Sequence, residues 1–482
     1  MMFKTAVLAA FLAFATMCSA ANSKIVCYYG SWANYRPGPG KFEVTDIDPT
    51  LCTHIIYTFV GLSADGNVQV LDSWLDLPSG LNGFGKFTKL RELSPSTKAM
   101  IAMGGWNEGS IKYSQMASNP AIRSRFVQNV VNFLKTYNFD GFDLDWEYPN
   151  QRGGNAADKQ NFVNLLSELR QELNKHGFLL SVAVGAAESS ASQSYLISQV
   201  AQYADFINLM TYDLNGSWNS NTGINAPLYA SSRESGNQAK LNANSAARYW
   251  ISQGAPANKL ILGIPAYGRS FTLANPGNNG VGAPTIGAGT AGPYTREAGM
   301  IGYNEICSNF GQGGWTVVRD NEQRVPYTFK GNQWIGYDDV QSVREKVNFI
   351  KALGLGGAMI WSVETDDFRG NCGQKYPLLR AINDVLRGYI PGPSPSQKPN
   401  PSVDPPRPSQ PEPSQPEPSP TSVTAVKCKR DGYIRDPHDC NTYYLCQKVN
   451  GQFTKYTFHC GAGLVFDPSF NGCNYRDRVP GC

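Results

Sequence analysis

The sequence lacks the features that mark several classes of protein. Its net charge is only +4 and no run is rich in Lys and Arg, so we expect no nucleic-acid partner. After residue 21, no apolar stretch reaches the roughly 18 residues that a membrane helix needs, so no membrane association is expected. With four His, no CxxC and no HExxH, neither a metal site nor another cofactor is expected.

The first 21 residues have the pattern of a secretory signal peptide. Lys4 precedes an apolar run from Thr5 to Met17, and the small residues 19–21 follow it. We therefore expect a secreted, extracellular protein. Of the eleven Cys, Cys18 would leave with this peptide, and the ten that remain are an even number suited to disulfides in an oxidising compartment.

Composition divides the mature chain into three parts. Residues 391–425 are rich in Pro and Ser, repeat Ser-Gln-Pro-Glu-Pro, and are predicted to form an extended linker. Residues 426–482 hold six Cys and are too short for a self-sufficient core, which is typical of a small disulfide-stapled domain of β type. Residues 22–390 are predicted to form the main domain.

Apolar runs typical of buried strands recur along the main domain and alternate with helical patterns such as Ile122–Tyr137 and Asp158–His176. Eight such runs predict a (β/α)8 barrel of the α/β class, with a doubly wound sheet as the alternative. A stretch between runs seven and eight is too long for one helix and predicts an α+β insertion at 270–340. The eight runs are Lys24–Gly30, Thr53–Gly61, Lys98–Gly105, Phe139–Glu147, Leu179–Gly185, Phe206–Asp213, Leu260–Arg269 and Gly357–Glu364.

Three acids alternate along the fourth run. In a strand, Asp143, Asp145 and Glu147 share one face, and the apolar residues between them share the other. The alternative is a solvated acidic edge, but the apolar opposite face indicates burial. Like charges this close cannot all ionise cheaply, so at least one pKa must rise. We expect Glu147 to hold a proton and deliver it.

Glycines, aromatic and charged residues gather at the ends of the other runs, where barrel enzymes place their chemistry. Gly104-Gly105-Trp106 follows strand three, Tyr212-Asp213 follows strand six, Tyr267 and Arg269 follow strand seven, and Trp361 lies near the end of strand eight.

The segment Asp140–Pro149 resembles the signature of family 18 glycoside hydrolases, Asp-Gly-x-Asp-x-Asp-x-Glu. The likeness extends over residues 24–389, and within the family it is greatest to the secreted animal chitinases of the acidic mammalian chitinase and chitotriosidase type. Residues 426–482 resemble a peritrophin-A-type chitin-binding domain through the stretches 441–446 and 463–467 and the Cys spacing. No Trp follows Trp361, so sugar stacking in that domain would fall to Tyr or Phe.

This resemblance implies an endo-acting chitinase that cleaves β-1,4-linked N-acetylglucosamine polymers with retention, using the substrate's acetamido group as the nucleophile. It implies that Glu147 is the proton donor, that Asp143 and Asp145 support it, that Tyr212 holds the acetamido oxygen and that Asp213 orients the sugar. Chitin and chitooligosaccharides are the expected partners of a monomeric protein. The substrate-binding residues implied are Trp32, Ser73, Trp74, Gly104, Gly105, Trp106, Asn107, Tyr148, Met210, Thr211, Trp218, Tyr267, Arg269 and Trp361.

Some aromatic and acidic residues have a structural interpretation instead. Trp32 and Trp74 would serve equally in loop packing, Tyr28 and Phe59 in filling the barrel, Trp250 in the core, and Asp140 falls out of step with the acidic row. The resemblance further implies the disulfides Cys27–Cys52, Cys307–Cys372, Cys428–Cys446, Cys440–Cys482 and Cys460–Cys473.

The acid-adapted relatives carry His where this chain has Asn208 and Arg269, so a broad, mildly acidic to neutral pH optimum is expected here. Asn215-Gly-Ser217 is an N-glycosylation triplet beside the expected cleft. The main alternative is a non-catalytic chitin-binding lectin, in which the catalytic Glu is replaced. An enzyme acting on protein N-glycans and a structural matrix protein are further alternatives.

Overall fold

The computed structural model describes residues 23–311 and 313–388 and, towards the C-terminus, 428, 432–449, 452–459, 464–468, 472–475 and 479. The chain divides into two units, Met1–Pro395 and Ser396–Cys482, and each is considered by itself. The expected signal peptide at 1–21 and linker at 391–425 lie outside the described residues. Among the described helices, none is long and apolar enough to span a membrane.

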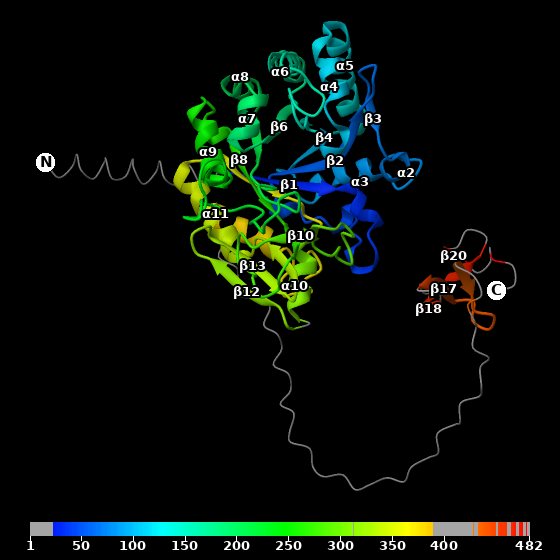
Figure 1. The fold of residues 1–482 in the computed structure, drawn as a ribbon. Coiled ribbons are helices and arrows are strands. Elements are labelled where there is room, and N and C mark those ends of the chain that lie inside the picture. Colours follow the sequence, from blue (N-terminus) through cyan, green and yellow to red (C-terminus); the bar gives the residue numbers. More distant parts are fainter. Residues whose placement is uncertain are drawn as a thin grey trace, which may run out of the picture. The chain divides into compact units, whose positions relative to one another are not determined.

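Within the described part of the first unit, eight parallel strands close into a barrel, which confirms the predicted fold class (Figure 1). They pair in chain order, and the ring closes because β1 pairs with both β15 and β2. The short strand β3 (Val68–Val70) extends the sheet by antiparallel pairing with β2. The barrel strands are β1 (Lys24–Gly30), β2 (His54–Leu62), β4 (Lys98–Gly104), β5 (Gly141–Asp145), β6 (Leu179–Gly185), β7 (Phe206–Met210), β8 (Leu260–Pro265) and β15 (Gly357–Trp361).

Helices surround the barrel, and their boundaries follow from local sequence. In α5, Asn119 caps the first turn by accepting from the backbone N–H of Ala121, and Pro120 occupies the first helical position. The helix ends at Tyr137, and Asn138 after it adopts a left-handed conformation with φ of 60°. The helices are α2 (Ser73–Asp76), α3 (Gly83–Lys89), α4 (Ile111–Ser118), α5 (Pro120–Tyr137), α6 (Asp158–Asn174), α7 (Glu188–Ser194), α8 (Ile197–Tyr203), α9 (Ala243–Ser252), α11 (Val340–Leu353) and α12 (Pro377–Arg387).

Alternation along the strands separates two cores. Phe142 and Leu144 of β5 point outward, where Phe142 lies 6.1 Å from Phe126 of α5 between ring centroids. Inward-facing residues of several strands, among them Tyr28 and Met359, form a separate cluster inside the barrel. Asp143 is on this inner face, so the strand places an acid where most barrels place an apolar side chain.

The predicted strand Leu260–Arg269 is wrong as a single element. It is two strands: β8 ends at Pro265, and β9 (Tyr267–Leu273) belongs to a second sheet. Pro265 has no N–H to continue the parallel ladder, and the N–H of Ala266 instead donates to the carbonyl of Trp361 at the end of β15. Tyr267 and Arg269 therefore lie on the insertion rather than on barrel strand seven.

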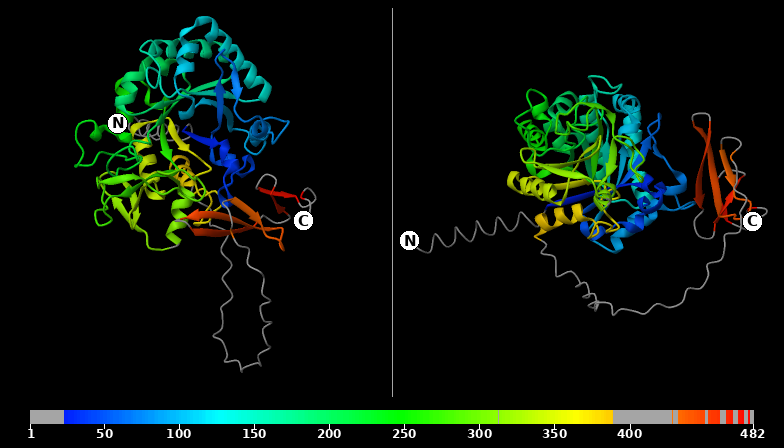
Figure 2. Two further views of the ribbon diagram at one scale, coloured as in Figure 1. Left: turned by 45° about the vertical axis from the view of Figure 1, so that its right-hand side comes forward. Right: turned by 60° about the horizontal axis from the view of Figure 1, so that its bottom comes forward.

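The insertion accordingly begins at Tyr267 rather than at residue 270. Its sheet has the order β10-β9-β14-β13-β12, with β11 paired to β9. In Figure 1 it lies on the side of the barrel away from α4, α5 and α6, and the left view of Figure 2 shows the same arrangement. Its elements are β10 (Thr285–Ala288), β11 (Met300–Gly302), α10 (Tyr303–Gly311), β12 (Thr316–Asp320), β13 (Val325–Lys330) and β14 (Gln333–Gly336).

The second unit contains a three-stranded antiparallel sheet of β16 (Gly432–Arg435), β17 (Thr442–Val449) and β18 (Gln452–His459), and a two-stranded sheet of β19 (Leu464–Asp467) and β20 (Gly472–Tyr475). The rings of Tyr443 and Phe466 stack at 4.4 Å and join the two sheets. Disulfides link Cys428 to Cys446 here, and Cys27 to Cys52 and Cys307 to Cys372 in the first unit. The expected pairs Cys440–Cys482 and Cys460–Cys473 involve residues outside the described part of the chain.

Gly104, at the end of β4, yields a test of this packing. It has φ of 121°, and a Cβ there would meet the carbonyl oxygen of Asp145 at 1.9 Å. We expect Gly104→Ala to lower the free energy of unfolding by about 3 kcal/mol or more. Gly236→Ala is the matched control, because Gly236 also has positive φ but nothing within 4 Å, and should cost only about 1 kcal/mol. Denaturant unfolding measures both, and equal losses would contradict the argument.

Candidate active site

Asp143 lies at the centre of the barrel and is fully buried. Three neighbouring side chains donate to its carboxylate: the Tyr28 hydroxyl to Oδ2 at 2.7 Å, and the Ser181 hydroxyl and Asn208 amide to Oδ1 at 2.5 and 3.3 Å. Burial raises the pKa of Asp143 to about 6, and these three donors oppose the rise. The donors come from three different strands, so the closed barrel itself assembles this arrangement.

Asp145 and Glu147 complete the acidic row at the C-terminal end of β5, and both are buried. Burial, Glu147 and Asp143 raise the pKa of Asp145 well above its usual value. Burial raises the pKa of Glu147 to about 7, against the lowering effects of a hydrogen bond with Tyr148 and the charge of Arg152. Oδ1 of Asp145 is buried without a hydrogen-bond partner among the described residues. The acidic row therefore holds protons near neutral pH, and Oδ1 of Asp145 is able to accept a hydrogen bond.

Trp146, between the two acids, points away from them and fixes the end of the strand. Its Nε1 donates to the Ser110 hydroxyl at 3.0 Å, and its ring stacks on Tyr113. The same hydroxyl donates to the carbonyl of Tyr148 at 2.9 Å. Ser110 thus binds both Trp146, which follows Asp145, and Tyr148, which follows Glu147, and these two contacts limit the movement of Glu147.

The glycines after β4 allow the next loop to approach the row. Gly105 donates its N–H to the carbonyl of Asp145 at 2.9 Å, and a Cβ at this position would meet the ring of Phe59 at 2.8 Å. Trp106 follows in the 3-10 helix η6 (Trp106–Glu108) and is 59% exposed. The Arg152 guanidinium lies 3.5 Å from the Trp106 ring centroid and donates to the carbonyl of Glu147 at 2.9 Å.

Asp213 is held by residues of the insertion. Arg269 grips its carboxylate with two hydrogen bonds of 2.7 and 2.6 Å, and the Tyr267 hydroxyl donates to it at 2.7 Å. The Arg269 guanidinium also lies 5.2 Å from the ring centroid of Trp218, which is 59% exposed. Tyr212 is buried, and its ring lies 6.2 Å from that of Tyr267.

Aromatic rings continue from Asp143 towards the surface. Tyr28, whose hydroxyl binds Asp143, has its ring 5.4 Å from that of Trp361. Trp361 in turn lies 6.3 Å from Trp32 and 5.9 Å from Phe59. Trp32 is 42% exposed and stacks on Phe59. These contacts place Trp361 nearer to the acidic row than Trp32.

The remaining expected site residues make few described contacts with the acidic row. Thr211 donates its hydroxyl to the carbonyl of Gly263 at 2.6 Å, Met210 packs against the inner barrel cluster, and Asn107 is exposed beside Trp106. Ser73 and Trp74 belong to α2, where Trp74 is 62% exposed, and no described contact joins them to the acidic row.

Three residues outside the substrate-binding set, Trp250, Asp140 and Asn215, have structural surroundings. Trp250 is buried in the core, and Asp140 forms an ion pair with Arg91 at 2.7 Å. The Asn215 side chain is buried and donates to the carbonyl of Ile224 at 3.0 Å, an environment that has no room for a glycan.

Sequence reasoning missed Ser181 and Arg152, and it considered Tyr28 for barrel filling or ligand contact but not as a partner of Asp143. Ser181 could have been found, because β5 and β6 are parallel neighbours and Asp143 lies opposite Ser181 in their register. A polar residue inside an otherwise apolar strand was the available signal. Arg152 lies in an irregular loop, and its sequence position gives no indication of its contact with Trp106.

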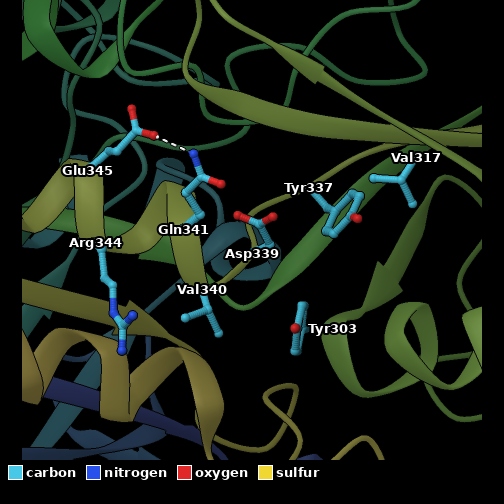
Figure 3. A pocket seen from close by; sticks show the side chains of 8 residues that line it. All are labelled: Tyr303, Val317, Tyr337, Asp339, Val340, Gln341, Arg344 and Glu345. Atoms are coloured by element: carbon cyan, nitrogen blue, oxygen red, sulfur yellow. Dashed lines mark hydrogen bonds between the residues drawn. The ribbon is translucent and has the colours of Figure 1, made fainter.

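A cavity of about 700 Å³ lies elsewhere, at the border of the insertion and α11. Its lining residues are Tyr303, Val317, Tyr337, Asp339, Val340, Gln341, Arg344 and Glu345 (Figure 3). None of these belongs to the acidic row or to the aromatic residues around it, so this cavity is not the candidate active site.

Comparison with known proteins identifies the class. Residues 24–366 match glycosyl hydrolases family 18, and residues 428–482 match the chitin binding Peritrophin-A domain. The chain belongs to family 18 of the glycosyl hydrolases. It is a chitinase-type member of that family with an attached chitin-binding domain.

Named relatives and solved structures agree with this class. The chain is 39% identical over 465 residues to chitotriosidase-1 of Mus musculus, covering 94% of this chain and 95% of that protein. It is 41% identical over 484 residues to probable chitinase 10 of Drosophila melanogaster, covering 95% of this chain but spanning only 20% of that protein. The crystal structure of Ostrinia furnacalis Group IV chitinase in complex with allosamidin is 48% identical, with a TM-score of 0.74 and coverage of 76% of this chain and 99% of that one.

The contact between Arg152 and Glu147 predicts a shift in pH dependence. Arg152 lowers the pKa of Glu147, so Arg152→Gln should raise it and move the alkaline limb of the pH–rate profile, expected near pH 7, to higher pH. Arg152→Lys is the matched control, since it keeps the charge but loses the planar stacking on Trp106. A limb that stays in place in Arg152→Gln would show that the charge of Arg152 does not reach Glu147.

Proposed function

We propose that the chain is a secreted enzyme that hydrolyses β-1,4-linked N-acetylglucosamine polymers with retention of configuration, using the acetamido group of the substrate as nucleophile. The observation that carries the proposal is the buried acidic row, in which Glu147 has a pKa of about 7 and Asp145 keeps one unpartnered oxygen. Such a row can supply both a proton donor and an acceptor for an amide N–H.

In the first step, Glu147 donates its proton to the oxygen of the scissile glycosidic bond. A carboxyl group with a pKa near 7 is still largely protonated at mildly acidic pH, and it is acidic enough to transfer the proton. Burial supplies this property, because taking the carboxylate out of water disfavours its charged form.

As the glycosidic bond breaks, the acetamido oxygen of the same sugar attacks the anomeric carbon and forms a bicyclic oxazolinium ion. Oδ1 of Asp145 accepts a hydrogen bond from the acetamido N–H, which leaves the carbonyl oxygen more nucleophilic and offsets the developing positive charge. We assign the Tyr212 hydroxyl to the acetamido oxygen, which it holds in line for attack.

Asp143 supports this step indirectly. Its carboxylate and that of Asp145 cannot both ionise cheaply in the barrel interior, and they share a proton. When Asp145 turns towards the substrate, the proton remains on Asp143, because burial disfavours the charged form of Asp143 more than the donors Tyr28 and Ser181 favour it. Water then attacks the anomeric carbon from the side the leaving group left and transfers a proton to Glu147. The bond between the anomeric carbon and the acetamido oxygen breaks, which restores the N-acetyl group.

The remaining parts of the chain fit a secreted enzyme that acts on an insoluble polymer. Asp213, held by Arg269 and Tyr267, orients the sugar at the cleavage point. The chitin-binding domain at 428–482 keeps the catalytic unit at the surface of the polymer, so that its effective concentration there is raised. The disulfides in both units suit an oxidising, extracellular compartment.

Glu147→Gln tests the assignment of the proton donor. The variant keeps the shape and loses the transferable proton, so hydrolysis of a fluorogenic chitobioside should fall by about 10² to 10⁴-fold. Binding of chitooligosaccharides, measured by calorimetry, should remain within a few-fold of the native chain. Retention of full hydrolysis would favour another acid. A native chain without hydrolysis but with intact binding would identify a lectin.

The source of the nucleophile is tested with the substrate. Oligosaccharides of glucosamine without N-acetyl groups should be cleaved at least about 10²-fold more slowly than their acetylated counterparts, because they lack the attacking oxygen. Proton NMR of the first product should show the β anomer before mutarotation. An α anomer as the initial product would exclude the oxazolinium route.

A further inference from the structure

Glu364 is a buried acid that the proposed mechanism does not use. It lies three residues after Trp361, and its side chain is completely buried. Its Oε2 accepts the backbone N–H of Gly30 at 3.1 Å, and its Oε1 accepts the hydroxyl of Ser362 at 2.5 Å. The Arg36 guanidinium lies 3.7 Å from Oε1. A charge buried this completely requires such partners, and they come from separate parts of the chain.

The backbone carbonyl of Glu364 also accepts hydrogen bonds from separate parts of the chain. Arg36 donates from Nη1 to the carbonyl of Glu364 at 3.1 Å, and Asn304 of α10 donates to the same carbonyl at 3.4 Å. The N–H of Asn304 also donates to the carbonyl of Thr365 at 3.0 Å. Glu364 is therefore the junction of three segments: the end of β1 with the loop after it, the end of β15, and the insertion.

Two of these segments carry Trp32 and Trp361, whose rings are neighbours. Trp361 is the last residue of β15, and Trp32 lies two residues beyond Gly30 in the 3-10 helix η1 (Ser31–Tyr35). A Cβ on Gly30 would meet Cζ2 of Trp32 at 2.7 Å and Oε1 of Glu364 at 2.6 Å. The Trp32 ring and the Glu364 carboxylate thus both pack against Gly30.

Trp32 needs such an anchor because burial does not fix it. The side chain is 42% exposed, and its ring neighbours are Phe59 at 6.1 Å and Trp361 at 6.3 Å. The helix η1 that carries it is short and has no side-chain cap. Arg36 directly follows this helix, and its side chain is 9% exposed. The guanidinium of Arg36 contacts both the backbone carbonyl and the carboxylate of Glu364.

We propose that Glu364 is a positioning residue that sets the orientation of Trp32 relative to Trp361 and thereby the affinity for long chitin chains. This inference rests on the proposed function, since it requires both rings to stack on sugars. Trp361 lies beside Tyr28 and the acidic row, whereas Trp32 lies beyond it. A short substrate cleaved at Glu147 reaches Trp361, and only a longer one extends over Trp32.

The test is Glu364→Gln in the full chain, assayed on a fluorogenic chitobioside and on chitohexaose. The neutral amide keeps the volume but loses the charge that holds Arg36 and Gly30. We expect kcat on both substrates and KM for the short one to stay within two-fold, and KM for chitohexaose to rise about five- to ten-fold. Asp366→Asn is the matched control, because Asp366 is equally buried in the same loop but accepts backbone N–H groups of α12.

A double-mutant cycle with Trp32→Ala separates positioning from general structural damage. If Glu364 acts through Trp32, Glu364→Gln should have no further effect on chitohexaose once Trp32 is absent. An equal loss on the two substrates, an effect that persists in the Trp32→Ala background, or an equal effect of Asp366→Asn would overturn the proposal. A native chain that cleaves neither substrate would instead contradict the proposed function itself.

Gly30→Ala is the second variant, for use if Glu364→Gln does not fold as judged by thermal unfolding. Its added methyl group would meet both the Trp32 ring and Oε1 of Glu364, so it disturbs the packing of these two side chains against residue 30 while the Glu364 charge is kept. The same selective rise in KM for chitohexaose is expected, and its absence would overturn the proposal.

Discussion

The removal of three carboxyl groups from water is the constraint on which the site depends. Asp143, Asp145 and Glu147 follow one another on the inner face and at the end of a single strand, and burial is the largest cause of the raised pKa of each. If they were solvated, all three would be ionised at neutral pH and none could donate a proton. Burial forces the row to retain protons, and exposure increases along the row from Asp143 to Glu147, which lies beyond the last residue of β5.

The barrel supplies what this burial requires. A lone buried acid would be destabilising, but Asp143 receives hydrogen bonds from β1, β6 and β7 through Tyr28, Ser181 and Asn208. Those strands are far apart in sequence and adjacent only because the sheet closes. Positions 208 and 269 hold an amide and a permanent cation rather than an imidazole, so the titration of these acids is governed by burial, by the hydrogen bonds they accept and by neighbouring charges such as Arg152.

Periodicity was enough to predict the barrel strands and the alternation of β5, because both depend on which side chains are apolar. It failed between Leu260 and Arg269, where the apolar run continues but Pro265 cannot extend a ladder and the chain enters a second sheet. Ser181 was predictable in principle from the strand register. The contact of Arg152 with Trp106 was not, since it joins an irregular loop to the short 3-10 helix η6 and no local pattern specifies the conformation of that loop.

The exposed Trp rings pose a different physical problem from the acids. A ring that is to stack on a sugar must keep one surface open, so packing alone cannot hold it. Trp106 lies beside the guanidinium of Arg152, which donates to the backbone carbonyl of Glu147. Trp218 lies beside the guanidinium of Arg269, which binds the carboxylate of Asp213. Trp32 has no such cation among the described contacts and rests on Gly30, whose N–H is bound by Glu364. In each case a charged group contacts the Trp ring or the residue on which that ring packs. Ion pairs and hydrogen bonds, rather than burial, therefore hold these exposed rings in place.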